Sequence, residues 1–122
     1  MSTEATYSAA VVVTLRTPEG LVVVNGRGCA VSQQEVHLLS ALLEREGRVV
    51  ARADLARRAW GLTLQSRDRR VDVCVHRLRR KLRRAAPGWD LIHTHHGFGY
   101  RFAPEPRVAD PDPFEIRSKE LA

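Results

Sequence analysis

Cysteine and long apolar runs are scarce in this chain of 122 residues. Cys29 and Cys74 are its two cysteines, and so wide a spacing gives neither a disulfide framework nor a zinc motif. We therefore expect free thiols, as in a cytoplasmic protein. The apolar runs are far shorter than the roughly 20 residues of a membrane span. Glu4 lies where a secretory signal would be basic, so no membrane partner is expected.

The sequence also lacks the patterns of a catalytic site. Its acids are scattered, and it has no serine–histidine–aspartate order and no phosphate-cradling loop. His93, His95 and His96 invite a metal interpretation, but no acid or cysteine lies beside them in the sequence to complete a tetrahedral shell. We expect no enzyme, no cofactor and no metal site. A metal- or thiol-based sensor that uses these histidines and Cys74 stays an alternative.

Basic charge is abundant and unevenly distributed. Of the 20 basic residues 18 are arginine, and the net charge is +6. Residues 67–84 hold nine of the basic residues against two acids, Asp68 and Asp72, so this segment alone has a charge of +7. So basic a segment in a short chain is typical of proteins that bind a polyanion.

Turn residues divide the first third of the chain into short strands. β-branched residues between turns that contain proline, asparagine or glycine predict three strands: Val11–Arg16, Leu21–Val24 and Gly28–Val31. Residues 1–10 are small and polar, so we expect a flexible N-terminus. The strands predict a small antiparallel sheet that needs a packing partner to be stable.

Three helices are predicted to follow the sheet. Ser32 and Glu35 have the spacing of a capping box, and helical spacing of the apolar residues continues to about Glu46. Gly47 would end this helix. A loop, residues 62–68, would separate the other two helices, which we expect over Ala53–Trp60 and Arg69–Arg84.

The C-terminal part predicts a hairpin and a tail. Strands are expected over Leu91–His95 and Phe98–Phe102, around a tip at His96–Gly97. The order of sheet, three helices and hairpin describes a winged helix-turn-helix, a mainly α fold with a small antiparallel sheet and a C-terminal β-hairpin wing. We place this domain over residues 11–103. Residues 104–122 are rich in proline and acids, so we expect a disordered tail.

The third predicted helix has two different faces. At 100° per residue, four apolar side chains fall on one narrow stripe that we expect to be buried: Val71, Val75, Leu78 and Leu82. The far side and its flanks hold basic residues and one small apolar residue: Arg69, Arg70, Val73, His76, Arg77, Arg80 and Arg84. No acid occurs in the sequence between residues 73 and 89, whereas a merely solvated helix face would mix charges of both signs.

The second face suits the major groove of DNA. Arginine reads guanine O6 and N7 in a bidentate way, and a small side chain such as Val73 can contact a thymine methyl. The residues therefore predict a regulator of transcription that binds double-stranded DNA, with the hairpin as a wing on the adjacent backbone or minor groove. The alternative is an interaction module that docks on RNA polymerase or another regulator through residues 62–68 or the tail. Its apolar handles would be Leu62, Leu64 and Phe114.

Ordered motifs along the chain resemble one family. They are Gly47-Arg48-Val49-Val50, Trp60-Gly61, Val71-Asp72-Val73 and Gly97-x-Gly99-Tyr100-Arg101-Phe102. Over roughly residues 11–103 the chain resembles the C-terminal effector domain of OmpR/PhoB-type response regulators of bacterial two-component systems. The resemblance implies a four-stranded N-terminal sheet, three helices and a hairpin wing.

The resemblance also implies site residues. Groove contacts carried over by position are Arg69, Arg70, Val73, Cys74, His76, Arg77 and Arg79. The wing contacts are Thr94, His96 and Tyr100, and a phosphate contact falls near Trp60. In some members the loop corresponding to Leu62, Thr63, Leu64 and Gln65 contacts RNA polymerase, and family members bind head-to-tail on direct repeats. The helical wheel places Arg79 on the flank of the helix, where we expect a phosphate contact rather than a base contact.

The chain departs from the family pattern in several places. His96 stands where arginine is usual, and because an imidazole gains its charge only in mild acid, DNA binding is expected to strengthen as the pH falls. Ala51 replaces a frequent serine and weakens the cap of the second helix, while Arg70 replaces a common threonine. Residues 1–10 are too few for the family's phosphorylated receiver domain, so the sequence is either an excised domain or a protein without receiver control.

Overall fold

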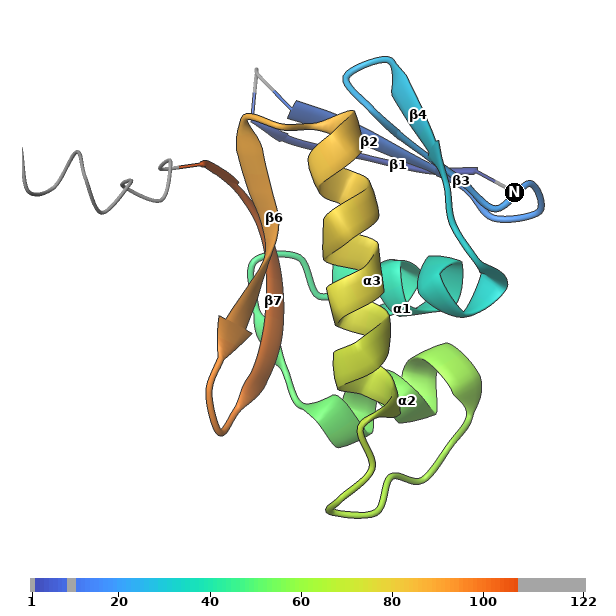
Figure 1. Ribbon diagram of the computed structural model, residues 1–122, viewed down its shortest axis with the longest axis vertical. Coiled ribbons are helices and arrows are strands. Elements are labelled where there is room, and N and C mark those ends of the chain that lie inside the picture. The colour runs from blue at the N-terminus through green and yellow to red at the C-terminus, as the bar shows by residue number, and fades with distance from the viewer. Residues whose placement is uncertain (1, 9–10, 108–122) are drawn as a thin grey trace, which may run out of the picture.

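A computed structural model describes residues 2–8 and 11–107 (Figure 1). Three helices stand between two small antiparallel sheets, and the chain passes from the N-terminal sheet through the helices to the C-terminal hairpin. The elements are β1 (Ser2–Ser8), β2 (Val11–Arg16), β3 (Leu21–Val24), β4 (Arg27–Ala30), α1 (Gln33–Glu44), β5 (Val49–Val50), α2 (Arg52–Trp60), α3 (Arg70–Ala85), β6 (Trp89–His95) and β7 (Gly99–Pro106).

The N-terminal sheet has the strand order β1-β2-β3-β4. Val11, Val13 and Leu15 alternate along β2 and are fully buried, as the period of two in a strand requires. The structure corrects one expectation here, because Ser2–Ser8 form a strand where we expected a flexible N-terminus. This strand pairs along the open edge of β2, from Ser2 opposite Arg16 to Ser8 opposite Val11. The N-terminal sheet thus has the four strands that the family resemblance implies.

The first helix starts as its sequence predicts. Ser32 Oγ accepts a hydrogen bond of 3.1 Å from the Glu35 amide, and Glu35 Oε1 accepts one of 2.7 Å from the Ser32 amide, which completes the capping box. The helix ends at Glu44, two residues before the expected end at Glu46. The Glu35 carboxylate also accepts a 2.5 Å hydrogen bond from Lys81 Nζ, so the start of α1 is tied to α3.

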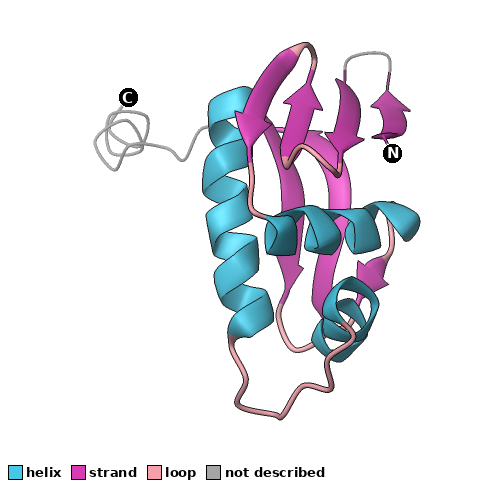
Figure 2. Cartoon of the chain, turned by 90° about the vertical axis from the view of Figure 1, so that its right-hand side faces the viewer, coloured by secondary structure: helices cyan, strands magenta, loops and turns pink. Residues whose placement is uncertain are grey.

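The helices enclose one core with the sheets. In Figure 2, α1 crosses in front of the strands while α3 runs beside it. The predicted stripe of α3 is buried, since Val71, Val75 and Leu78 are 0% exposed and Leu82 is 3% exposed. Its neighbours in the core are fully buried side chains of α1, α2 and β7: Leu38, Leu39, Leu42, Leu55 and Phe102.

The C-terminal hairpin is longer than predicted. β7 begins at Gly99 rather than Phe98 and continues to Pro106, opposite Trp89 in β6. Residues 104–106 therefore belong to the hairpin and not to the tail, because the pairing with β6 satisfies their backbone. β5 adds a third strand, with Val50 opposite Tyr100. Most of the predicted tail, including Phe114, lies outside the described residues.

Candidate nucleic-acid interface

One face of α3 is basic and open to solvent. Arg77, Arg80 and Arg84 follow each other at helical spacing along this face, and all three are exposed. Within the described residues none of them has an ion-pair or hydrogen-bond partner. His76 is exposed beside them, and Val73 is 44% exposed although it is apolar. These positions agree with the far side of the helix that the sequence predicts.

At the N-terminal end of α3 the arginines have partners. Arg70 donates hydrogen bonds to the Asp68 carboxylate, the shortest 2.5 Å from Nη2 to Oδ2. This contact lowers the pKa of Asp68 to about 2, so the pair is charged at neutral pH. Arg69 lies 3.9 Å from Asp72, a looser contact that leaves most of its side chain exposed. Arg69 is therefore more available to an anionic partner than Arg70 is.

The structure removes Cys74 from this surface. Its side chain is 6% exposed and belongs to the core, although the family resemblance implied a groove contact at this position. Burial raises the pKa of the Cys74 thiol to about 12. A neutral, buried thiol is neither a base contact nor the reactive thiolate that a thiol sensor needs. Arg77 and Lys81 favour the thiolate, but desolvation outweighs their charge.

Tyr100 also lies inside the domain rather than on the wing surface. The residue is 7% exposed, and its hydroxyl donates a 2.6 Å hydrogen bond to Asp72 Oδ1. Arg52 binds the same carboxylate, through Nε at 3.0 Å and Nη2 at 2.6 Å. Burial opposes the charge of Asp72, but the hydrogen bonds from Arg52 and Tyr100 outweigh it and lower the Asp72 pKa. Tyr100 therefore positions the wing through Asp72, and its hydroxyl already has a partner within the domain.

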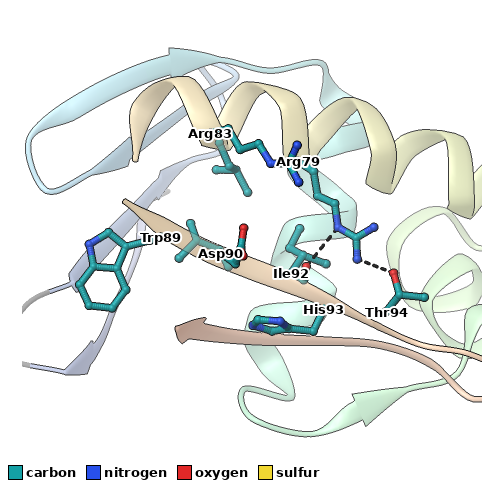
Figure 3. A pocket seen from close by; sticks show the side chains of 9 residues that line it. Arg79, Arg83, Trp89, Asp90, Ile92, His93 and Thr94 are labelled. Atoms are coloured by element: carbon teal, nitrogen blue, oxygen red, sulfur yellow. Dashed lines mark hydrogen bonds between the residues drawn. The ribbon is translucent and has the colours of Figure 1, made fainter. Parts of the chain in front are cut away.

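Arg79 connects α3 to the wing. Figure 3 shows its guanidinium between α3 and β6, where Nε donates to the Ile92 carbonyl oxygen at 3.1 Å and Nη2 donates to Thr94 Oγ1. Its charge also lies 5.6 Å from the centre of the Tyr100 ring, within the range of a cation–π contact. Burial lowers the Arg79 pKa. With these partners Arg79 is a positioning residue that holds β6 against α3. The hydroxyl of Thr94 accepts one of its hydrogen bonds.

The three wing histidines have separate surroundings. His93 Nε2 lies 2.7 Å from the Ala103 carbonyl oxygen, and His95 Nε2 accepts a 3.0 Å hydrogen bond from Arg101 Nε. His96 is exposed at the tip. Among residues 2–8 and 11–107, no three histidine, cysteine, aspartate or glutamate side chains are grouped to hold a metal ion.

Two hollows border the basic face. A groove of about 730 Å³ separates the N-terminal half of α3 from the wing, and its lining residues include Arg52, Arg69, His76, Arg79 and His96. A second hollow of about 300 Å³ lies against Trp60, Val73 and Arg77. Trp60 Nε1 donates to the Gln34 carbonyl oxygen at 3.1 Å, which fixes the indole at the border of the basic face.

The loop between α2 and α3 has two kinds of residue. Leu62 and Leu64 are half-buried and pack against the core, so they are poor apolar handles for a partner. Thr63 and Gln65 point to solvent.

In the part of the chain that the structure describes, no helix has the length and apolar character to cross a membrane.

Sequence reasoning did not find the Arg52–Asp72–Tyr100 cluster as a unit. Its members come from α2, α3 and β7, and they lie 20 and 28 positions apart in the sequence. Local spacing has no signal for such a contact, because helices and strands determine which distant residues meet. The family motifs contained Asp72 and Tyr100, but only as matches to a family.

A helix-turn-helix with a basic third helix and a β-hairpin beside it defines the winged-helix class. The sequence matches the family described as "Transcriptional regulatory protein, C terminal" over residues 26–102. The chain belongs to this family.

The relatives extend the comparison. The transcriptional regulatory protein AfsQ1 of Streptomyces coelicolor is 36% identical over 80 residues, which are 66% of this chain and 36% of that protein. The response regulator SaeR of Staphylococcus aureus is 33% identical over 82 residues, 67% of this chain and 36% of SaeR. The chain thus matches little more than a third of the length of these curated relatives.

Solved structures share the fold. The DNA-binding domain of CpxR from E. coli superposes with a TM-score of 0.68 at 26% identity, covering 83% of this chain and 96% of that one. The Klebsiella pneumoniae RstA DNA-binding domain, solved in complex with the RstA box, has a TM-score of 0.68 at 29% identity and covers 84% and 98%.

Proposed function

We propose that this chain binds double-stranded DNA in a sequence-specific way and thereby regulates transcription. The observation that carries the proposal is the exposed face of α3. There, Arg77, Arg80 and Arg84 have no ion-pair or hydrogen-bond partner among the described residues, and the apolar Val73 is exposed on the same face. Unpaired arginines at helical spacing match the phosphates and guanine edges of a major groove. The RstA domain, which has the same fold, was solved with its DNA box, and that likeness supports the proposal.

The site residues have different proposed roles. Arg69, Val73, His76 and Arg77 lie toward the N-terminal half of α3 and would meet base edges, as recognition helices do. Arg80 and Arg84 lie further along the helix and would meet phosphates. Trp60 would contact a DNA phosphate from the border of the basic face. Thr94 and His96 would contact the DNA backbone from the wing. Arg70 would join them once DNA draws it from Asp68.

Further partners follow from the resemblance. We propose head-to-tail binding on direct repeats and, through the exposed Thr63 and Gln65, contact with RNA polymerase in the cytoplasm. Because Leu62 and Leu64 pack on the core, the loop offers mainly polar contacts. This favours DNA binding over the interaction module as the principal function.

A selection experiment tests the proposal. The protein selects a site from a random duplex pool, and fluorescence anisotropy then compares that site with random DNA at several salt concentrations. Specific binding predicts a preference of about 10³-fold or more. Equal affinity for both duplexes with a steep salt dependence would leave only phosphate attraction and would contradict sequence-specific regulation.

A further inference from the structure

The tip of the wing exposes a large aromatic side chain. Phe98 is 76% exposed, which is well above the values for the other exposed large apolar residues of the described chain, Val49 at 42% and Val73 at 44%. A single exposed apolar residue is common on protein surfaces and means little alone. The position and rigidity of the wing tip indicate that the exposure of Phe98 has a functional role.

The backbone around Phe98 is held in place. The Phe98 amide donates a 2.9 Å hydrogen bond to the His95 carbonyl oxygen, which closes the turn. On the other side, Gly99 has φ +146°, and a Cβ there would lie 2.0 Å from the Val50 carbonyl oxygen and 2.9 Å from Ala51 Cα. The wing therefore lies directly against the start of α2. Phe98 projects from a tip whose place relative to the helix-turn-helix is fixed.

Phe98 lies on the far wall of a cationic groove. The groove of about 730 Å³ has Arg69, His76 and Arg79 on the α3 side, and His96 and Phe98 on the wing side. A sugar–phosphate strand is the part of DNA that suits such a groove, because its phosphates are negatively charged and the groove is lined by several basic side chains. One side of that strand borders the major groove, which α3 would occupy. The other side borders the minor groove, which the wing tip would then face.

We infer that Phe98 inserts into the minor groove next to the site of α3 and acts as an apolar wedge. The inference rests on the proposed function. An aromatic side chain in the minor groove packs on sugars and base edges, and wedges of this kind partly unstack a base step and bend the duplex. The contact would favour pyrimidine–purine steps, which deform easily. Phe98 thus adds a preference at base pairs that α3 does not reach.

Two variants of Phe98 and one control variant test the wedge on the selected duplex. Phe98→Ala removes the aromatic ring, Phe98→Trp keeps one, and Val49→Ala is the control for loss of an exposed apolar residue. Since Phe98 is exposed, all three proteins should melt near the wild-type temperature. The measurements are affinity at several salt concentrations, end-to-end energy transfer across the duplex as a readout of bending, and the fluorescence of 2-aminopurine placed at each step beside the major-groove site.

We expect Phe98→Ala to bind about 10- to 100-fold more weakly with an unchanged salt slope, because the lost contact is uncharged. In the wild type, binding should bend the duplex and raise the fluorescence of 2-aminopurine at the unstacked step. Both changes should be lost with Phe98→Ala and kept with Phe98→Trp and Val49→Ala. If the wild type selects a site but Phe98→Ala binds and bends it equally, the wedge is refuted while the proposed function stands. If the wild type selects no site, both are refuted.

Discussion

The hydroxyl of Tyr100 donates a 2.6 Å hydrogen bond to Asp72 Oδ1, so that the wing is joined to the recognition helix. Asp72 also accepts hydrogen bonds from Nε and Nη2 of Arg52 in α2. The second helix, the third helix and the wing thus share one carboxylate. Because a DNA duplex fixes the distance between its grooves, a protein that uses a helix and a wing together needs this relation to be constant.

The first prediction concerns the phenol itself. Tyr100→Phe removes the hydroxyl but leaves Asp72 paired with Arg52, so the free energy of unfolding should fall by about 1 kcal/mol, the value of one hydrogen bond. Affinity for the selected duplex should fall as well, since the wing is held less firmly. Urea unfolding and anisotropy measure the two effects. Unchanged affinity together with lowered stability would show that the hydroxyl serves folding alone.

The second prediction concerns acid. Because the folded-state pKa of Asp72 is lowered, its stabilising contribution is present above the ordinary carboxylate pKa of about 4 and is lost as the pH falls through the folded-state value. Asp72→Asn should therefore be less stable than the wild type at pH 7. The difference between the two proteins should narrow as the pH falls below about 4. Unfolding curves across this range check the prediction, and a constant difference would contradict it.

The third prediction separates two arginines that lie two residues apart in α3. Arg77 is exposed and has no partner among the described residues, so Arg77→Ala should lower specific affinity about tenfold or more with a stability change within about 0.5 kcal/mol. Arg79 is bonded to β6, so Arg79→Ala should lower the free energy of unfolding by about 1 to 2 kcal/mol as well as the affinity. Anisotropy and urea unfolding distinguish the two.

A control with the same charge change is available on the N-terminal sheet. Arg16 at the end of β2 has a side chain that is 50% exposed and a weak contact with Glu19. Arg16→Ala should change neither specific affinity nor its salt slope by much. If Arg16→Ala weakens binding as strongly as Arg77→Ala, the effect is one of net charge, and α3 has no special role.

Local signals in the sequence were sufficient for most of the fold. The capping box of Ser32 and Glu35 fixes the start of α1 through neighbours three residues apart, and the stripe from Val71 to Leu82 needs only helical periodicity to define a buried face. Both predictions are confirmed. β1 was missed because STEATYS has no apolar pattern of its own. Its partner is the edge of β2, and edge pairing depends on a neighbouring strand rather than on composition.

The candidate site was harder to predict where packing decides orientation. On a helical wheel Cys74 lies at the edge of the apolar stripe, and in the structure that edge is buried, since Cys74 is 6% exposed. Tyr100 alternates along β7 as a strand residue should, but its hydroxyl reaches Asp72 only because β5 and β6 position the hairpin against α3. The exposure of Arg77, Arg80 and Arg84 needed no such information, since helical periodicity alone places them opposite the buried stripe.

The last prediction tests how firmly the wing lies against the helix-turn-helix. Gly99→Ala would place a Cβ 2.0 Å from the Val50 carbonyl oxygen at φ +146°, so the backbone must shift and the free energy of unfolding should fall by about 3 kcal/mol or more. Gly97 is the matched control. Its φ is +82° with open space around it, so Gly97→Ala should cost only about 1 kcal/mol of backbone strain.

Thermal and urea unfolding measure both glycine variants, and anisotropy shows whether specific binding is lost with the wing. A backbone shift at residue 99 moves the tip away from Ala51, whereas a change at residue 97 leaves that contact in place. Specific affinity should therefore fall much more for Gly99→Ala than for Gly97→Ala, under conditions where both proteins are folded. Equal losses in the two variants would mean that the tip tolerates displacement, and then the contact with Val50 is no constraint on how the wing meets DNA.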